Sequence, residues 1–184
     1  MATAKTGSFY LTESVLVPAA SVSGTRVQGT IDLGAYVNVP TGQAVAIESV
    51  DFIYQNQNDL TSAAEALLAS NGSITSQLSD LNPSTDFIRA DNQSLVASAC
   101  LNIDTINNVS SHSTDMFPDN FGPAALSEAF MVVNDTLYLV AGNDGAAALA
   151  GQGFFVTARI KCRVVKLSNK DFMAIAIQST ASDN

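Results

Sequence analysis

Apolar and polar residues alternate along most of this chain, which is the pattern of β-strands with one buried face. Residues 9–17 and 26–33 alternate in this way on either side of a turn rich in Ser and Gly. The other strand candidates are residues 33–39, 44–54, 73–78, 94–103, 129–140 and 153–167. We therefore expect an all-β fold in one domain over residues 1–184, an antiparallel β-sandwich of the eight-stranded single jelly-roll type with one or two short helices.

The alternation changes phase inside the segment 44–54. Val45 and Ile47 occupy odd positions, whereas Val50, Phe52 and Tyr54 occupy even positions. Because strand side chains point alternately to opposite faces, an uncorrected phase change would turn half of these residues to solvent. The sequence therefore predicts a β-bulge at Glu48-Ser49.

Two segments carry helical signals, and one long segment carries signals for a loop. Residues 62–69 are rich in Ala and Leu, follow Thr61 as a candidate N-cap, and predict about two helical turns. Residues 168–171 have the capping-box form Ser-x-x-Asp before the apolar run 172–177, which predicts a C-terminal helix with a final strand as the alternative. Residues 105–127 are polar and contain Pro and Gly, so we expect an exposed loop.

Composition favours a subunit over a free nucleic-acid binder. The chain is 47% hydrophobic and only 14% charged, and its net charge is −9. A weakly charged surface rich in Ser, Thr and Asn suits burial against other subunits, whereas neutralising phosphates requires clustered Lys and Arg. Because neither a signal peptide nor a membrane span is apparent in the sequence, we expect a chain made soluble in the host cytoplasm.

Side chains suited to catalysis are scarce. The chain has one histidine and two cysteines, so we expect no enzyme, no catalytic or cofactor-binding residues and no metal site. Cys100 and Cys162 are interpreted as buried free thiols, with a disulfide as the alternative. His112 with Asp115 could form a Ser-His-Asp set, but a solvated loop histidine is the favoured interpretation. A calcium site built from loop carboxylates stays open.

A cluster of basic residues is the sharpest local feature. In the segment 159–164 the polar side chains should project from one face of a strand while Ile160, Cys162 and Val164 enter the core. The projecting residues predict a subunit interface, or an inner surface that contacts genome or anionic lipid. The alternative is a solvated face whose positive charges are balanced by carboxylates on neighbouring strands. The candidate interface residues are Arg159, Lys161, Arg163 and Lys166.

The order of these segments resembles the small single jelly-roll capsid proteins of tailless icosahedral viruses. The resemblance rests on the strands throughout, the helical insertion at residues 62–69, the loop at 105–127 and the closing strand at 156–167. It implies a structural subunit of a virion that assembles with copies of itself, and with a second capsid protein in some shells, into an icosahedral capsid. Residues 1–25 contain Lys5 as their only basic residue, unlike the basic arms of small RNA-virus coat proteins, which favours a double-stranded-DNA virus.

Two other functions stay open. The first is a non-viral oligomeric β-sandwich that binds carbohydrate or a receptor, although such a module usually presents an aromatic-lined pocket and this chain has no Trp and four Tyr. The second is an enzyme, such as a glycosidase, whose site is assembled from loop carboxylates.

Overall fold

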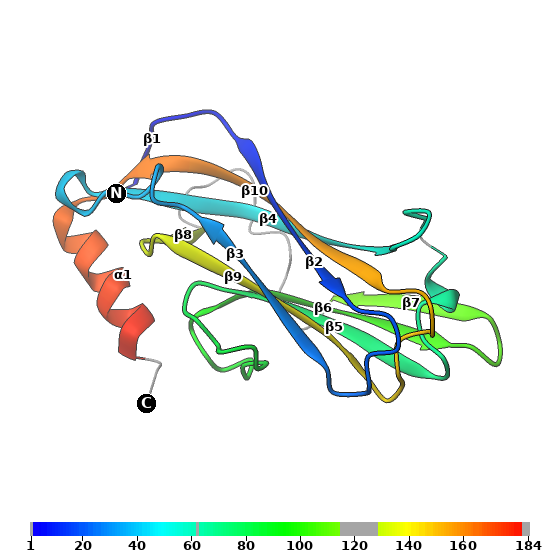
Figure 1. Ribbon diagram of the computed structural model, residues 1–184. Coiled ribbons are helices and arrows are strands. Elements are labelled where there is room, and N and C mark those ends of the chain that lie inside the picture. The colour runs from blue at the N-terminus through cyan, green and yellow to red at the C-terminus, as the bar shows by residue number, and fades with distance from the viewer. Residues whose placement is uncertain (1, 62, 115–128, 182–184) are drawn as a thin grey trace.

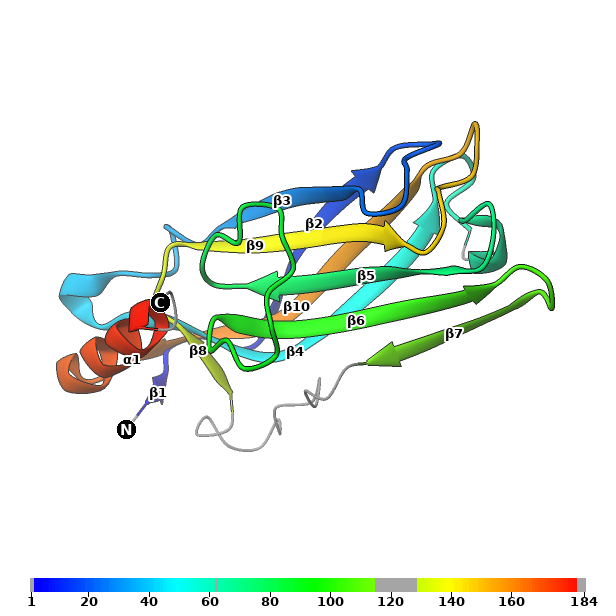
Figure 2. The same ribbon diagram turned by 90° about the horizontal axis from the view of Figure 1, so that it is seen from below.

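Two antiparallel β-sheets face each other in the computed structural model, which describes residues 2–61, 63–114 and 129–181 (Figures 1 and 2). The first sheet contains β1 (Thr3–Ala4), β2 (Phe9–Val17), β4 (Gln43–Asn56), β8 (Phe130–Val132) and β10 (Phe154–Lys166). The second contains β3 (Arg26–Asp32), β5 (Gly72–Ser79), β6 (Leu95–Asp104), β7 (Val109–Thr114) and β9 (Thr136–Asp144). The remaining elements are the 3₁₀ turns η1 (Val39–Thr41) and η2 (Ala64–Ala66) and the helix α1 (Asn169–Ala181).

The strand order identifies the sandwich as a jelly roll. One sheet runs β2-β10-β4-β8, with β1 continuing the β2 side of β10, and the other runs β3-β9-β5-β6 with β7 outside β6. In both sheets a late strand therefore lies between two early ones. In the first sheet β10 lies between β2 and β4, and in the second β9 lies between β3 and β5. This interleaving of four strands in each five-stranded sheet is the double Greek-key arrangement of a jelly roll, and the predicted fold class is confirmed.

The core lies between the inner faces of the two sheets. Val17, Ile47 and Ile160 from one sheet and Leu78 and Leu139 from the other are at most 1% exposed. They are contributed by the alternating segments identified in the sequence, so burial of one face per strand accounts for the pairing of the sheets.

The predicted bulge is present in β4. Cys162 of β10 lies opposite Ile47, and the preceding Lys161 lies opposite Ser49, so that Glu48 is the extra residue. The bulge keeps Ile47 and Val50 on the inner face although their numbers differ in parity.

The C-terminal helix is also confirmed. It begins as the capping box predicts, with the backbone N–H of Asp171 donating to the Ser168 hydroxyl at 3.2 Å. Its buried residue Phe172 packs in a second apolar cluster with Ala44, Ala46 and Val165. These three β-residues alternate with core residues on β4 and β10, and α1 lies at one end of the sandwich, where its last turns also contact the end of β5 (Figure 1).

Two strand predictions require correction. Residues 33–39 form turns leading into η1 instead of a strand, because the Asp32 carboxylate accepts the Gly34 N–H at 2.7 Å and Asn38 caps η1. The segment 129–140 contains two strands, β8 and the start of β9, separated by a turn at Asn134 and Asp135.

The helical and loop predictions were also partly wrong. Within residues 62–69 the helical structure is limited to η2, whose N-cap position is Ala63 with no side-chain cap hydrogen bond, since Thr61 lies too early to cap it. The expected loop at residues 105–127 includes the strand β7, which pairs with β6 and places His112 opposite Leu101. Residues 115–127 lie outside the described residues. In the described part of the chain, no helix combines the length and the apolar character needed to cross a membrane.

Candidate interaction surfaces

Three of the predicted basic residues, Arg159, Lys161 and Arg163, lie on the outer face of β10, and Lys166 is the last residue of the strand. Arg159 and Lys166 are exposed, while Lys161 and Arg163 retain about a third and a quarter of their side-chain exposure, at 35% and 25%. Ile160, Cys162 and Val164 point into the sandwich, as the alternation predicted. The strand thus carries three cations on one face, Arg159, Lys161 and Arg163, with Lys166 at its end on the other face, and the four cations differ in how far they are already compensated.

Glu48 compensates two of the four cations. Its side chain is 5% exposed and forms ion pairs with Arg163 and, at 3.5 Å, with Lys161. The hydroxyl of Ser8 donates to both of its oxygens, at 3.1 and 3.0 Å. Burial alone would raise the pKa of Glu48, but the hydrogen bonds from Arg163 and Ser8 and the two positive charges outweigh it, so the pKa lies below the ordinary 4.5.

Arg159 and Lys166 keep more of their charge available. The Arg159 guanidinium lies over the ring of Tyr10, 4.6 Å from its centroid, and Asp51 is its register partner on β4. Neither Arg159 nor Lys166 forms an ion pair with any residue in the described ranges. Of the four basic residues, these two are therefore the ones expected to bind an anionic partner.

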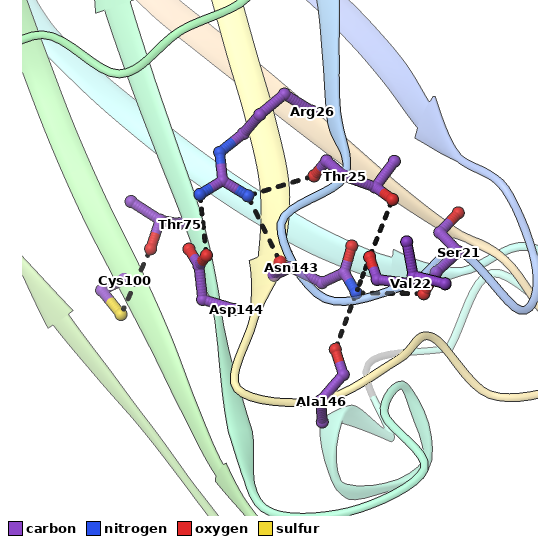
Figure 3. A network of polar contacts seen from close by, with 9 residues as sticks. All are labelled: Ser21, Val22, Thr25, Arg26, Thr75, Cys100, Asn143, Asp144 and Ala146. Carbon is purple, nitrogen blue, oxygen red and sulfur yellow. Dashed lines mark hydrogen bonds and ion pairs between the residues drawn. The ribbon is translucent and has the colours of Figure 1, made fainter.

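The end of the sandwich opposite α1 is organised by a polar network (Figure 3). The side-chain amide of Asn143, which is fully buried, donates to the carbonyls of Ser21, Val22 and Ala146 at 3.2, 3.1 and 2.7 Å. It thereby joins the β2–β3 loop to the β9–β10 loop. Such bonds satisfy loop carbonyls that burial would otherwise leave unpaired.

Arg26 extends this network along the outer side of the second sheet. Its guanidinium donates to the Asn143 carbonyl at 3.3 Å, pairs with Asp144 at 2.7 Å and lies over the Phe87 ring, 4.3 Å from its centroid (Figure 3). Arg26 also donates to the Thr25 carbonyl at 3.2 Å and is thus held by four partners. We interpret this network as the set of contacts that holds the β2–β3 and β9–β10 loops in place.

Apolar side chains are exposed at both ends of the molecule. In the loops around the Asn143 network, Val22, Leu60 and Ile106 are 70, 56 and 80% exposed. At the other end, Met173 and Ile177 are spaced by one helical turn on the solvent side of α1. Exposed apolar residues of this kind are candidates for contacts with other protein surfaces.

A pocket of about 270 Å³ lies between α1 and the sandwich. Polar groups of Asp80, Gln93 and Ser179 line it together with apolar residues of β8 and α1. Asp80 is 3% exposed, and burial raises its pKa to about 6 against the lowering effect of a hydrogen bond from Ser179. No signal in the sequence distinguished Asp80 from the other aspartates, because its burial depends on α1 packing beside the end of β5.

The other chemical candidates are placed separately. Cys100 and Cys162 are free thiols, with Cys162 buried and Cys100 partly exposed. His112 lies on β7 and not in a loop, with its ring centroid 5.8 Å from that of Tyr54, and Asp115 lies outside the described residues. Across residues 2–61, 63–114 and 129–181, no group of three or more His, Cys, Asp or Glu side chains is placed to hold a metal ion.

The fold and these surfaces define a jelly-roll β-sandwich with basic, apolar and polar surface features. No known protein-family pattern and no curated protein sequence matches the chain. One solved structure with a similar fold is the VP1 protein of Trichodysplasia spinulosa-associated polyomavirus in complex with 3′-sialyllactose. The two chains are 9% identical, the similarity covers 90% of this chain and 97% of that chain, and the TM-score is 0.47. The class assigned here rests on the strand order itself.

Proposed function

We propose that this chain is a structural subunit of a viral capsid that assembles with copies of itself into a closed shell. The observation that carries the proposal is the strand order β2-β10-β4-β8 facing β3-β9-β5-β6. Viral capsid proteins use this order, as do lectins and cupins, so the step from fold to role is an analogy. Features of the exterior favour the capsid role among these three.

The exterior suits repeated contacts between copies. Only 14% of the residues are charged, so a contact made by this surface desolvates few ions. The apolar residues exposed in the loops and on α1 lie at opposite ends of the sandwich, which allows one copy to contact neighbours on two sides (Figure 1). Closed shells require such contacts at more than one surface of each subunit.

The four basic residues of β10 supply a candidate contact with the shell's contents. Because Glu48 already neutralises part of the charge of Lys161 and Arg163, Arg159 and Lys166 carry most of the charge available to a genome or an inner membrane. A net charge of −9 suits a shell that is filled after assembly or encloses a membrane, as in tailless double-stranded-DNA viruses. The proposed location is the virion.

The test is the mass of the purified native protein. We expect closed particles in the megadalton range by native mass spectrometry and electron microscopy, alone or with a second capsid protein. A protein that stays monomeric at micromolar concentration, both alone and with a second capsid protein, would contradict the proposal. Binding of a monomer or small oligomer to a glycan array would favour the carbohydrate-binding alternative in its place.

A variant test addresses the contacts directly. The double variant Leu60→Ser and Ile106→Ser removes exposed apolar side chains without touching the core, so it should fold and yield at least tenfold fewer particles. Gly7→Ala is the matched control, since no atom lies within 4 Å of the added methyl. Equal particle yields for the double variant and the control would exclude the loop end from the contacts.

A further inference from the structure

We propose that Asp80 is a proton-operated latch for the C-terminal helix, which docks firmly on the sandwich when Asp80 is protonated and loosens when Asp80 is ionised. The latch concerns how α1 is held and does not depend on the capsid role.

Three segments meet at Asp80. The residue directly follows β5, and the Ser179 hydroxyl of the last turns of α1 donates to its Oδ2 at 3.1 Å. The side-chain amide of Asn134, in the β8–β9 turn, donates to the Asp80 carbonyl at 3.0 Å, to Oδ2 of Asp80 at 3.4 Å and to the Ser179 hydroxyl oxygen at 3.2 Å. Asp80 and Ser179 are 3% and 6% exposed. The carboxyl group therefore sits in the contact between α1 and the sandwich.

One oxygen of this carboxyl group is poorly satisfied. Oδ1 of Asp80 is buried and has no hydrogen-bond partner among the described residues. An ionised carboxylate spreads its negative charge over both oxygens, so burial of a bare Oδ1 penalises the ionised form much more than the neutral acid. The neutral acid can instead place its proton on Oδ2 and donate to the Ser179 hydroxyl, which leaves Oδ1 as an uncharged carbonyl.

No described cation offsets the charge of ionised Asp80. Within α1 the charged residues are in the first turn, at the end remote from Ser179. In the segment that links β5 to β6, Arg89 pairs with Asp91. The charged residues of the described elements packed around Asp80 are Lys170 and Asp171 on α1, Asp135 on the β8–β9 turn, and Asp86, Arg89 and Asp91 on the β5–β6 segment. None of them forms an ion pair with Asp80.

The pocket beside the latch explains why a proton is the controlling species. It is lined by Asp80, Phe130, Ile175 and Ser179 among others, so water reaches the edge of the α1 contact. Oδ1 itself is closed to solvent. A hydrated cation cannot reach this oxygen while α1 is docked, whereas a proton can be transferred to the carboxyl group through its hydrogen-bonded side.

The direction of the pH effect follows from the pKa of Asp80, which burial raises from 3.8 to about 6. Because the docked form binds the proton more tightly than an exposed aspartate does, docking is strongest at low pH and weakens as the pH rises through about 6. With these two pKa values, the equilibrium constant for opening of α1 rises about tenfold between pH 5 and pH 7.5.

Hydrogen exchange of the whole protein at pH 5 and pH 7.5 tests the latch. After correction for the intrinsic pH dependence of exchange, amides in the last turns of α1 should lose about tenfold in protection at the higher pH, whereas those of β9 should not. In Asp80→Asn, a neutral side chain of the same shape, the protection should be the same at both pH values. Asp86→Asn, at an exposed aspartate of the β5–β6 segment, is the matched control and should behave as the wild type.

Two results would overturn the proposal. One is equal protection of α1 in the wild type at both pH values, and the other is an undiminished pH effect in Asp80→Asn. If Asp80→Asn does not fold, the proposal is tested by a pH titration of the carboxyl carbon-13 chemical shifts of the wild-type protein. Asp80 should titrate near 6 together with the amide shifts of α1, and a midpoint near 4 would refute the latch.

Discussion

Glu48 shows how a single residue can determine the character of a charged strand face. It is the bulge residue of β4 and lies buried between Lys161 and Arg163. Without it, two neighbouring cations on β10 would repel each other at a surface that is only partly hydrated. What the sequence presents as a basic cluster is therefore, at this position, a three-residue ion network.

Glu48→Gln should destabilise the fold by about 2 kcal/mol at pH 7. This magnitude lies between the small contribution of exposed ion pairs and the several kcal/mol lost when a fully buried pair is broken, because the cations retain part of their exposure. Urea unfolding measures the difference. Asp51→Asn, at an exposed carboxylate on the same strand, is the control and should change stability by less than about 0.5 kcal/mol.

The pH dependence of this effect has a fixed sign. The pKa of Glu48 is lowered in the folded protein, so its stabilisation is present above the ordinary value of 4.5 and is lost as the pH falls through the folded value. The stability difference between wild type and Glu48→Gln should therefore shrink below pH 4.5. A difference that stays constant down to pH 3 would show that packing, and not charge, is responsible.

The two thiols should differ in reactivity. Burial, with a smaller contribution from the charge of Glu48, raises the pKa of Cys162 to about 12, whereas Cys100 is partly exposed. We expect one thiol per chain to react with a thiol-specific reagent at pH 8 in the native protein and two after unfolding. Reaction of both at equal rates in the native protein would contradict the buried position of Cys162.

At the scale of elements, α1 is attached through one face. Phe172, Ile175, Ala176 and Ser179 face the sandwich, whereas Met173 and Ile177 face solvent. This spacing places the contacts on one stripe of the helix. The helix therefore depends on packing against this end of the sandwich, through the second apolar cluster and the contact of Ser179 with Asp80.

Phe172→Ala should cost about 2–4 kcal/mol, because it removes the largest buried side chain of the second apolar cluster. The neighbouring Met173→Ala should cost less than about 0.5 kcal/mol, since Met173 is 54% exposed. Both are measured by urea unfolding followed by far-ultraviolet circular dichroism. Similar losses for the two variants would mean that α1 is held by another face.

The elements predicted correctly are those with strong alternation. Residues 9–17 coincide with β2, and the bulge was evident from the phase of the apolar residues around Glu48. The errors occurred where local hydrogen bonds override alternation, as at Asp32 and Asn38, and where a short polar turn at Asn134 divides one apolar run.

The candidate surfaces could be predicted only in part. The alternation correctly placed Arg159, Lys161 and Arg163 on the outer face of β10, because strand geometry fixes which side chains share a face. Their pairing with Glu48 and the burial of Asp80 could not be predicted, because both depend on contacts between segments distant in the sequence. Such contacts follow from the tertiary arrangement and leave no local pattern.

At the scale of the whole molecule, net charge should control association. On the proposed capsid role, copies that each carry a net charge of −9 repel one another, and salt screens this repulsion within about 10 Å at 0.1 M. Assembly followed by light scattering should therefore increase as salt is raised from about 10 mM to 0.5 M. Dissociation on adding salt would indicate that subunit contacts depend on opposite charges, with Arg159 and Lys166 as the first candidates.

The bulge has a consequence for how the length of this chain can vary. If Glu48 were deleted, Ile47 and Ser49 would face Cys162 and Lys161 as they do now, and the ladder between β4 and β10 would become continuous. Loss of an interior residue elsewhere in β4 would instead exchange inward and outward side chains on one side of the gap. The strand therefore has one position at which a homologue could be a residue shorter without inverting the sheet, and such a homologue would have to supply its counter-charge from elsewhere.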